Sequence, residues 1–139
     1  RLTIIHRDPL FIVDGAHNPA AADMLEDSVR KYFKGRKMYF IMGVFRDKDY
    51  SYIIRKLCPY AEQIITIETP DNPRALPAQE LAKAVWECNP HVQAAENIQD
   101  AVNKVFAMAD REDVILSFGS LSFIGEITTI VKNREEKNL

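Results

Sequence analysis

Hydrophobic residues along this chain alternate between short continuous runs and longer stretches in which they recur every three or four positions. Short runs are typical of strands buried on both faces, and the spaced pattern is typical of amphipathic helices. We expect strands at Leu2–Ile5, Leu10–Val13, Lys37–Val44, Gln63–Ile67, Val92–Ala94 and Asp113–Phe118. We expect helices at Pro19–Phe33, Tyr50–Leu57, Pro77 to the Asn89-Pro90 break, Ile98–Ala109 and from Gly119-Ser120 onward, with a polar tail, Lys132–Leu139, that frays.

This order of elements predicts an α/β fold. Strands separated by helical segments form parallel βαβ units with right-handed crossovers, and the helices cover both faces of the sheet. The first strand is short and ends at the polar Arg7-Asp8-Pro9 turn, so we expect it at an antiparallel edge. No internal repeat, low-complexity tract or linker interrupts the pattern. Residues 1–139 are therefore expected to form one Rossmann-like domain with a mostly parallel sheet.

Composition narrows the choice of partners and compartment. The 18 basic and 20 acidic side chains leave a formal net charge of −2, which does not favour binding to nucleic acid or to an anionic membrane. No apolar run approaches the roughly 20 residues that span a bilayer. Cys58 and Cys88 lack metal-ligand spacing and are expected to be free thiols, as suits a reducing cytosol. We expect a cytoplasmic protein, and because the chain starts at Arg1 we expect it to be a piece of a longer one.

The most informative candidate for function is the turn after the second expected strand, Asp14-Gly15-Ala16-His17-Asn18-Pro19. Asn18 is suited to cap a helix and Pro19 to begin it. Ligands of open α/β sheets bind beyond the carboxyl ends of the strands, where Asp14 and His17 would lie. A tight turn without a ligand also explains the glycine, the asparagine and the proline, but it explains the acid and the imidazole less well.

Polar groups at three other expected strand ends are expected at the same edge of the sheet: Arg46-Asp47-Lys48-Asp49, Arg74, and the segment from Ser117 to Ser122 around Gly119-Ser120. A glycine and a serine at a helix start resemble a small anion-binding turn, because the first N–H groups of the helix are free for a carboxylate or phosphate. Each feature also has a simpler explanation: a solvated turn with weak local ion pairs, a surface loop residue, and a glycine needed for close packing. The simpler explanation is favoured for the charged turn.

Several familiar motifs are missing from the sequence. It contains no GxxxxGK[ST] phosphate loop, no GxGxxG and no cluster with metal-ligand spacing. The chain is therefore not expected to hold a nucleoside triphosphate by itself in either familiar way.

Taken together, these residues resemble a known family. The run from Asp14 to Ala22 is similar to the second signature of folylpolyglutamate synthase and dihydrofolate synthase, which belong to the Mur ligase superfamily. The supporting positions are Arg1, Gly43 with Asp47-Lys48-Asp49, Pro73-Arg74-Ala75, Gly119-Ser120-Leu121 and Gly125-Glu126. The resemblance covers essentially the whole chain as the C-terminal domain of that enzyme. It implies that the larger N-terminal domain, with the phosphate loop, the magnesium ligands and most of the folate pocket, lies outside this chain.

The resemblance also implies a reaction and roles for individual residues. The full enzyme would use ATP and Mg²⁺ to phosphorylate a folate or dihydropteroate carboxylate, which the amino group of glutamate then attacks. Arg1 and His17 would be catalytic, with Arg1 at the triphosphate and His17 beside the nucleotide, and Asp14 would accept hydrogen bonds from the ribose. Lys48, Arg74 and Ser120 are similar in position to residues that receive the carboxylates of glutamate. The isolated chain is expected to be inactive, and the full protein is expected to be a monomer that closes around ATP.

Two other interpretations remain open at this stage. The chain can be a stand-alone ligand-binding or receiver-like regulatory module in which Asp14 is an acceptor or a metal ligand, or a purely structural α/β domain. A receiver would place an acidic pair after its first core strand and a lysine late in the sheet, whereas the last expected strand here ends in Phe118-Gly119-Ser120. The sequence does not decide whether the parent enzyme adds the first glutamate to dihydropteroate, extends existing folates or does both.

Overall fold

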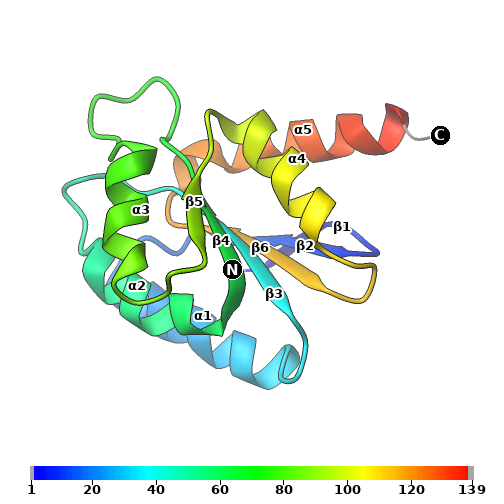
Figure 1. Ribbon diagram of the computed structural model, residues 1–139, viewed down its shortest axis with the longest axis horizontal. Helices are drawn as coiled ribbons and strands as arrows, with labels where there is room; N and C mark the ends of the chain where they lie inside the picture. Colours follow the sequence, from blue (N-terminus) through cyan, green and yellow to red (C-terminus); the bar gives the residue numbers. More distant parts are fainter. Residues whose placement is uncertain (1, 138–139) are drawn as a thin grey trace.

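A six-stranded sheet forms the centre of the molecule in the computed structural model, which describes residues 2–137 (Figure 1). The strands are β1 (Thr3–His6), β2 (Leu10–Val13), β3 (Met38–Met42), β4 (Ala61–Thr66), β5 (Val92–Ala94) and β6 (Val114–Phe118). The helices are α1 (Pro19–Tyr32), α2 (Tyr50–Leu57), α3 (Ala78–Trp86), α4 (Ile98–Met108) and α5 (Ile124–Lys137), with single 3₁₀ turns η1 (Cys58–Tyr60) and η2 (Leu121–Phe123).

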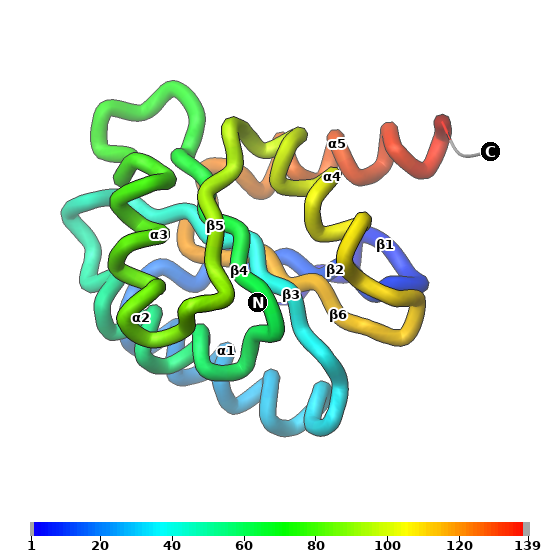
Figure 2. Tube along the Cα trace, in the orientation of Figure 1, coloured from blue at the N-terminus to red at the C-terminus, as the bar shows by residue number. Residues whose placement is uncertain are grey.

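The strand order is β1-β2-β6-β3-β4-β5, and every pair is parallel except β1 with β2. The expected α/β fold with one antiparallel edge strand is therefore confirmed. The last strand, β6, is inserted between β2 and β3, as the orange segment between the blue and cyan strands in Figure 2 shows. Val13 of β2 is paired with Ser117, and Met42 of β3 is paired with Phe118. The chain segments that leave β2, β3 and β6 consequently start side by side at one edge of the sheet.

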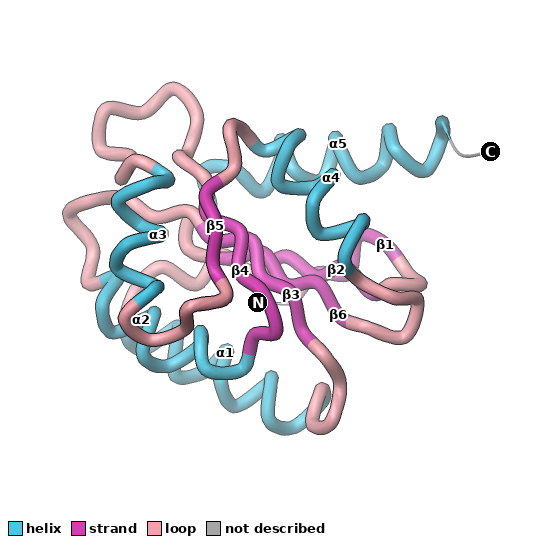
Figure 3. The backbone as a smooth tube through the Cα atoms, in the orientation of Figure 1, coloured by secondary structure: helices cyan, strands magenta, loops and turns pink. Residues whose placement is uncertain are grey.

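Two helical layers cover the sheet, one on each face (Figure 3). Helices α1, α2 and α3 pack on one face, and α4 and α5 pack on the other. Successive residues of a strand point to opposite faces, so Phe40 of β3 belongs to the first core and Ile41 to the second. Each fully buried aromatic or aliphatic side chain of this kind stabilises the fold by about 1.5–3 kcal/mol. Both faces of the central strands are therefore apolar, which explains their continuous hydrophobic runs.

Two expectations about where elements end are wrong. The strand expected to reach Val44 ends at Met42, because the Val44 carbonyl turns to accept a hydrogen bond from Leu76 N at 3.0 Å instead of continuing the ladder. The helix expected to fray from Lys132 continues to Lys137.

Contacts between α5 and α4 explain why the polar end of α5 stays helical. Val131 is buried in the second core. The Arg134 guanidinium donates to Asn103 Oδ1 at 3.2 Å and lies 4.5 Å from the centre of the Phe106 ring. A long cationic side chain can thus cover apolar surface while its charge stays in water.

The expectation of free thiols is confirmed for both cysteines. Cys58 is buried at the end of α2, and burial raises the pKa of its thiol. A buried protonated thiol is a poor nucleophile, so Cys58 is a core residue.

The backbones of β3 and β6 approach each other closely where both strands end. Gly119 has φ +115°, a conformation that side chains other than glycine rarely adopt, and a Cβ placed there would lie 2.1 Å from the Gly43 carbonyl oxygen. The Gly43 N–H in turn donates to the Phe118 carbonyl at 3.3 Å. Close packing alone therefore requires the glycine after β6, which is the simpler of the two explanations the sequence allowed.

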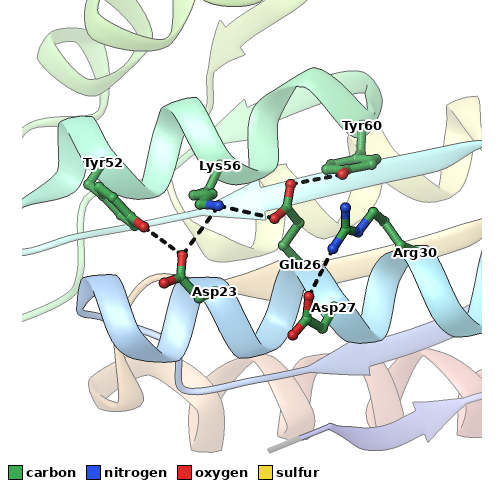
Figure 4. A network of polar contacts seen from close by, with 7 residues as sticks. All are labelled: Asp23, Glu26, Asp27, Arg30, Tyr52, Lys56 and Tyr60. Carbon is green, nitrogen blue, oxygen red and sulfur yellow. Dashed lines mark hydrogen bonds and ion pairs between the residues drawn. The ribbon is translucent and has the colours of Figure 1, made fainter.

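A polar cluster ties α1 to α2 and η1 on the outer surface of the first layer (Figure 4). The Tyr52 hydroxyl donates to Asp23 at 2.6 Å, and the Tyr60 hydroxyl donates to Glu26 at 2.8 Å. The Lys56 ammonium lies between the two carboxylates, 3.5 Å from Asp23 and 3.3 Å from Glu26. The cluster therefore holds α1, the helix that follows the turn from Asp14 to Asn18, against α2 and η1.

This cluster predicts a loss of stability at alkaline pH. The Asp23 carboxylate accepts the hydroxyl hydrogen bond and thereby raises the pKa of Tyr52 above its ordinary value of 10.0. Because the pKa is raised in the folded state, the bond stabilises the fold fully below the ordinary value and is lost as the pH rises through the raised one. Tyr52→Phe should lower the Tm at pH 8, and the difference from wild type should shrink as the pH rises from about 10 to about 12.

Thermal unfolding followed by circular dichroism at several pH values measures this effect. Tyr32→Phe is the control, because Tyr32 is an exposed residue outside the cluster. A Tyr52→Phe difference that stays constant across this pH range would show that the hydroxyl bond makes no titrating contribution.

The contact between Gly119 and Gly43 predicts a large difference between two glycine substitutions. Gly119→Ala should lower the free energy of unfolding by about 3 kcal/mol, because it adds backbone strain and a clash with a carbonyl. Gly125→Ala, in the first turn of α5 with open space around its Cβ, should change stability by less than about 1 kcal/mol and in the stabilising direction. Urea unfolding of both variants checks this, and equal effects would contradict it.

Candidate functional site

The turn after β2 holds its carboxylate through backbone hydrogen bonds. Asp14 N donates to the Ser117 carbonyl at 2.9 Å, which extends the pairing of β2 with β6 by one residue. Asp14 Oδ1 accepts from Ala16 N at 2.8 Å, so the side chain closes its own turn. Asn18 then caps α1 by accepting from Ala21 N at 2.9 Å, with Pro19 in the first helical position, as the sequence predicts. Asp14 as a residue is 5% exposed and lies directly after the carboxyl end of β2.

His17 is held in one orientation by the same turn. Its Nδ1 lies 2.8 Å from the Gly15 carbonyl oxygen. A carbonyl only accepts hydrogen bonds, so Nδ1 carries the proton and Nε2 is the acceptor atom of the neutral ring. The imidazole is half-buried. The bond to the Gly15 carbonyl fixes the direction in which its acceptor nitrogen points.

A cleft of about 650 Å³ opens between β1, the turn after β2, α1 and the start of α5. Asp14 and His17 both line it, which confirms the expectation that the two side chains share the crevice at this edge of the sheet. Three large apolar side chains that line the cleft, Ile4, Met24 and Leu121, are exposed. The cleft therefore combines a buried acid, an imidazole and an apolar rim.

A second cavity, of about 420 Å³, adjoins the first. It brings together four residues that the sequence singled out on four different loops: His17, Lys48, Arg74 and Ser120. Of its other polar or aromatic lining residues, Ser122 belongs to the segment after the last strand that the sequence indicated, whereas Phe45 and Asn72 were missed. Their only signal in the sequence is that they lie within three residues of the ones that were found. His17 and Leu121 line both spaces.

Ser120 does not open a long helix directly, contrary to expectation. A single 3₁₀ turn, η2, separates it from α5. The Ser120 hydroxyl caps this turn by accepting from Ser122 N at 3.1 Å, and it also lies 2.8 Å from the Ser122 hydroxyl. A 3₁₀ turn is common at the start of an α-helix, and here it follows directly on Gly119, whose backbone lies close to β3. The hydroxyls of Ser120 and Ser122 therefore line this side of the cavity, in place of the N-terminus of an α-helix.

The charged turn after β3 is joined to the loop after β4. The sequence predicted ion pairs within the turn, but Asp47 instead pairs with Arg74 of the other loop. Arg46 N donates to the Arg74 carbonyl at 2.7 Å, and the Arg46 guanidinium donates to the Ala75 carbonyl at 3.1 Å. Asp47 pairs with Arg74 at 2.8 Å, and this hydrogen bond lowers the pKa of the Asp47 carboxyl. Asp49 accepts from the backbone of α2 and caps that helix. The two loops therefore form one wall of the second cavity.

Arg1 lies outside the described residues, so its predicted place at the site stays a prediction. Within residues 2–137, no group of three or more His, Cys, Asp or Glu side chains is arranged to hold a metal ion. No helix in the same part of the chain has the length and apolarity to cross a membrane.

Comparison with known proteins places this geometry in a family. The chain matches the family described as Mur ligase, glutamate ligase domain, over residues 1–121. Dihydrofolate synthase/folylpolyglutamate synthase of Mycobacterium tuberculosis is 32% identical over 112 residues, which make up 79% of this chain and 23% of that protein. The protein of the same name from Buchnera aphidicola is 26% identical over 136 residues, or 96% of this chain and 31% of that protein.

Solved structures agree with the sequence relatives. E. coli FolC in complex with ADP has a TM-score of 0.86 at 23% identity, covering 98% of this chain and 32% of its own, and it supports the fold. Mycobacterium tuberculosis folylpolyglutamate synthase complexed with ADP and AMPPCP has a TM-score of 0.78 at 28% identity, covering 97% of this chain and 31% of its own. The chain thus spans a third or less of the length of these relatives.

These matches confirm the resemblance that the turn after β2 indicated, and they do not support the receiver-like alternative. With the family match extending from residue 1 through the Gly119-Ser120 turn, the chain belongs to the Mur ligase family as its glutamate ligase domain.

Proposed function

We propose that this chain is the C-terminal domain of an ATP-dependent ligase that joins glutamate to folate or dihydropteroate. The observation that carries the proposal is the pair of adjoining spaces at one edge of the sheet, with Asp14 in one, Lys48 and Arg74 in the other, and His17 in both. Relatives named dihydrofolate synthase/folylpolyglutamate synthase, and solved relatives in complex with ADP, support the two kinds of ligand.

The first cleft is the proposed nucleotide side. Asp14 lines this cleft, and its carboxylate is an acceptor suited to the ribose hydroxyls of ATP. The oriented imidazole of His17 lies beside the nucleotide and takes part in its orientation as the domains close. Arg1 supplies a fixed positive charge to the triphosphate in this proposal. The volume of the cleft is within the range of about 300–1,000 Å³ that ligand sites occupy.

The second cavity is the proposed glutamate side. Glutamate carries two carboxylates, and this cavity is lined by two cationic side chains, Lys48 and Arg74. An ammonium acts as a point charge, whereas a guanidinium forms two parallel hydrogen bonds with a carboxylate. The Ser120 hydroxyl adds a short neutral donor. The chemistry of the lining therefore fits a small dicarboxylic amino acid better than a neutral one.

The reaction proceeds in two balanced steps. A carboxylate oxygen of the folate or dihydropteroate attacks the γ-phosphorus of ATP, and an acyl phosphate and ADP form. The amino nitrogen of glutamate then attacks the acyl carbon, the amide bond forms, and inorganic phosphate leaves while the amine loses a proton. Positive groups that surround the transferred phosphoryl group stabilise its charge.

The remaining parts of the site belong to the N-terminal domain in this proposal. Mg²⁺ neutralises phosphate charge when bound, and residues 2–137 contain no group of three or more His, Cys, Asp or Glu side chains that could hold it by themselves. Closure of the two domains around ATP brings the groups of this chain to the reacting atoms only in the assembled state.

Removal of the Asp14 charge should weaken the use of ATP. Asp14→Asn in the full-length protein keeps an acceptor for Ala16 N, so the turn stays intact, but it loses a charged acceptor for the ribose. A hydrogen bond to a charged group contributes about 1.5–3 kcal/mol, so kcat/KM for ATP should fall about 10- to 100-fold while KM for glutamate stays near wild type. Asp100→Asn, which also removes a charge that accepts from a backbone N–H, is the control and should change neither constant. Unchanged ligation by Asp14→Asn would count against the nucleotide assignment.

Loss of either cation should weaken glutamate binding. Arg74→Ala and Lys48→Ala in the full-length protein should each raise KM for glutamate about 10- to 100-fold, with a much smaller effect on KM for ATP. The matched control is Arg36→Ala, which removes an exposed guanidinium that donates to the Glu112 carbonyl at 2.8 Å, away from both spaces. Steady-state kinetics with glutamate varied at saturating ATP measures the effect. If the two substitutions lower only the Tm, the second cavity is not the glutamate site.

A further inference from the structure

The guanidinium of Arg74 is held by two side chains from the neighbouring loop. Its Cζ lies 4.6 Å from the centre of the Phe45 ring. Asp47 Oδ2 accepts from Nε at 3.2 Å and from Nη2 at 2.8 Å. The backbone is fixed as well, since Arg74 N donates to Asn72 Oδ1 at 2.9 Å and the carbonyl accepts from Arg46. One edge of the group is therefore occupied, and the group lies over the Phe45 ring.

This arrangement leaves a defined part of the group for a ligand. A guanidinium has five N–H donors in one rigid plane. Asp47 takes the side that Nε and Nη2 share. Of the three other donors, two point outward side by side from the end formed by the two terminal nitrogens. That end has the spacing to bind a second carboxylate through two parallel hydrogen bonds. Arg74 lines the same cavity as Lys48.

Stability does not explain the ion pair between Arg74 and Asp47. The two side chains are 50% and 53% exposed, and ion pairs in such positions stabilise folded proteins little. The two loops are already joined by backbone bonds: Phe45 bridges Ala75, and Leu76 N donates to Val44 O at 3.0 Å.

Charge alone does not explain the pair either. A negative charge next to a cavity that receives carboxylates weakens the attraction for them. Asp47 also stays ionised, because the hydrogen bond from Arg74 lowers the pKa of its carboxyl. An ionised Asp47 therefore does not act by attracting carboxylates to the cavity.

We propose that Asp47 and Phe45 are positioning residues, which fix the Arg74 guanidinium so that its free end meets a carboxylate of the incoming amino acid. The inference rests on the proposed function, which places Arg74 at the glutamate carboxylates. An arginine side chain that is already ordered loses less conformational entropy when a ligand binds. The expected gain from holding one such side chain in place is about tenfold in affinity.

Asp47→Asn in the full-length protein tests the sign of this effect. If the ion pair between Asp47 and Arg74 has no role in the site, Asp47→Asn should leave KM for glutamate unchanged, or should lower it because a repelling charge is gone. Positioning predicts the opposite: KM for glutamate rises about tenfold, while kcat and KM for ATP stay within about twofold of wild type. Phe45→Leu, which keeps an apolar side chain but removes the aromatic face, should act in the same direction. Asp47→Glu restores the charge and should recover most of the affinity.

The matched control breaks an ion pair of the same kind elsewhere. Asp27 pairs with Arg30 on α1 at 3.0 Å, and these side chains are 73% and 60% exposed. Asp27→Asn should leave every kinetic constant unchanged. Thermal unfolding of each variant should stay near wild type, so that a change in KM reports on the site and not on folding.

Arg74→Ala separates failure of this inference from failure of the proposed function. If Arg74→Ala does not raise KM for glutamate, the glutamate assignment itself is wrong. If it does, and Asp47→Asn leaves KM unchanged or lowers it, only the positioning role is overturned. Because Asp47 acts through Arg74, adding Asp47→Asn to the Arg74→Ala variant should raise KM no further, and an additional tenfold rise would contradict the inference.

Discussion

The insertion of β6 between β2 and β3 determines where three of the four loops of the candidate site lie. The last strand in the sequence, β6, lies in the middle of the sheet. Its end packs so closely against the end of β3 that a Cβ at Gly119 would clash with the Gly43 carbonyl. Segments far apart in the sequence thus leave the sheet beside one another. The acid and imidazole after β2, the charged turn after β3 and the hydroxyls after β6 become neighbours because the strand order makes them so. The positions of these polar groups therefore depend on the packing of β6 against β3.

The loop after β4 shows how a site can be built from surface elements. It leaves a strand farther along the sheet, yet backbone hydrogen bonds fasten it to the loop after β3, and Arg74 reaches the shared cavity. The pairing of Arg74 with Asp47 adds little to the stability of the fold, since both partners are in contact with water. Its value in this account is geometric, because an arginine with one edge occupied presents the other edge in a fixed direction. In this account, an exposed ion pair next to a cavity orients a side chain that lines the cavity, whereas an ion pair of the same kind on an open helix has no such effect.

Local rules predicted much of this structure from the sequence, and long-range contacts limited the rest. Leu10–Val13 and Tyr50–Leu57 were predicted at their observed bounds, because hydrophobic periodicity and capping residues act over a few positions. The turn from Asp14 to Pro19 was likewise predicted with its Asn18 cap and with Asp14 and His17 in one crevice. The partner of Asp47 was not, since it lies in another loop, and neither was the helical end of α5, which depends on a contact with α4. The 3₁₀ turn after Ser120 and the close approach of Gly119 to β3 were also not predicted, because periodicity does not distinguish a 3₁₀ turn from the first turn of an α-helix and does not reveal which backbones meet.

The central claim is that this domain supplies one wall of a ligase site whose other wall, with the phosphate-binding machinery, lies in the rest of the protein. ATP-dependent incorporation of labelled glutamate into tetrahydrofolate and dihydropteroate tests it most directly, with this chain alone and the full-length protein assayed side by side and circular dichroism confirming that each is folded. The account predicts incorporation by the full-length protein and none by the chain alone. Incorporation by the isolated chain would contradict the division of the site between two domains, and an inactive full-length protein would contradict the ligase assignment itself.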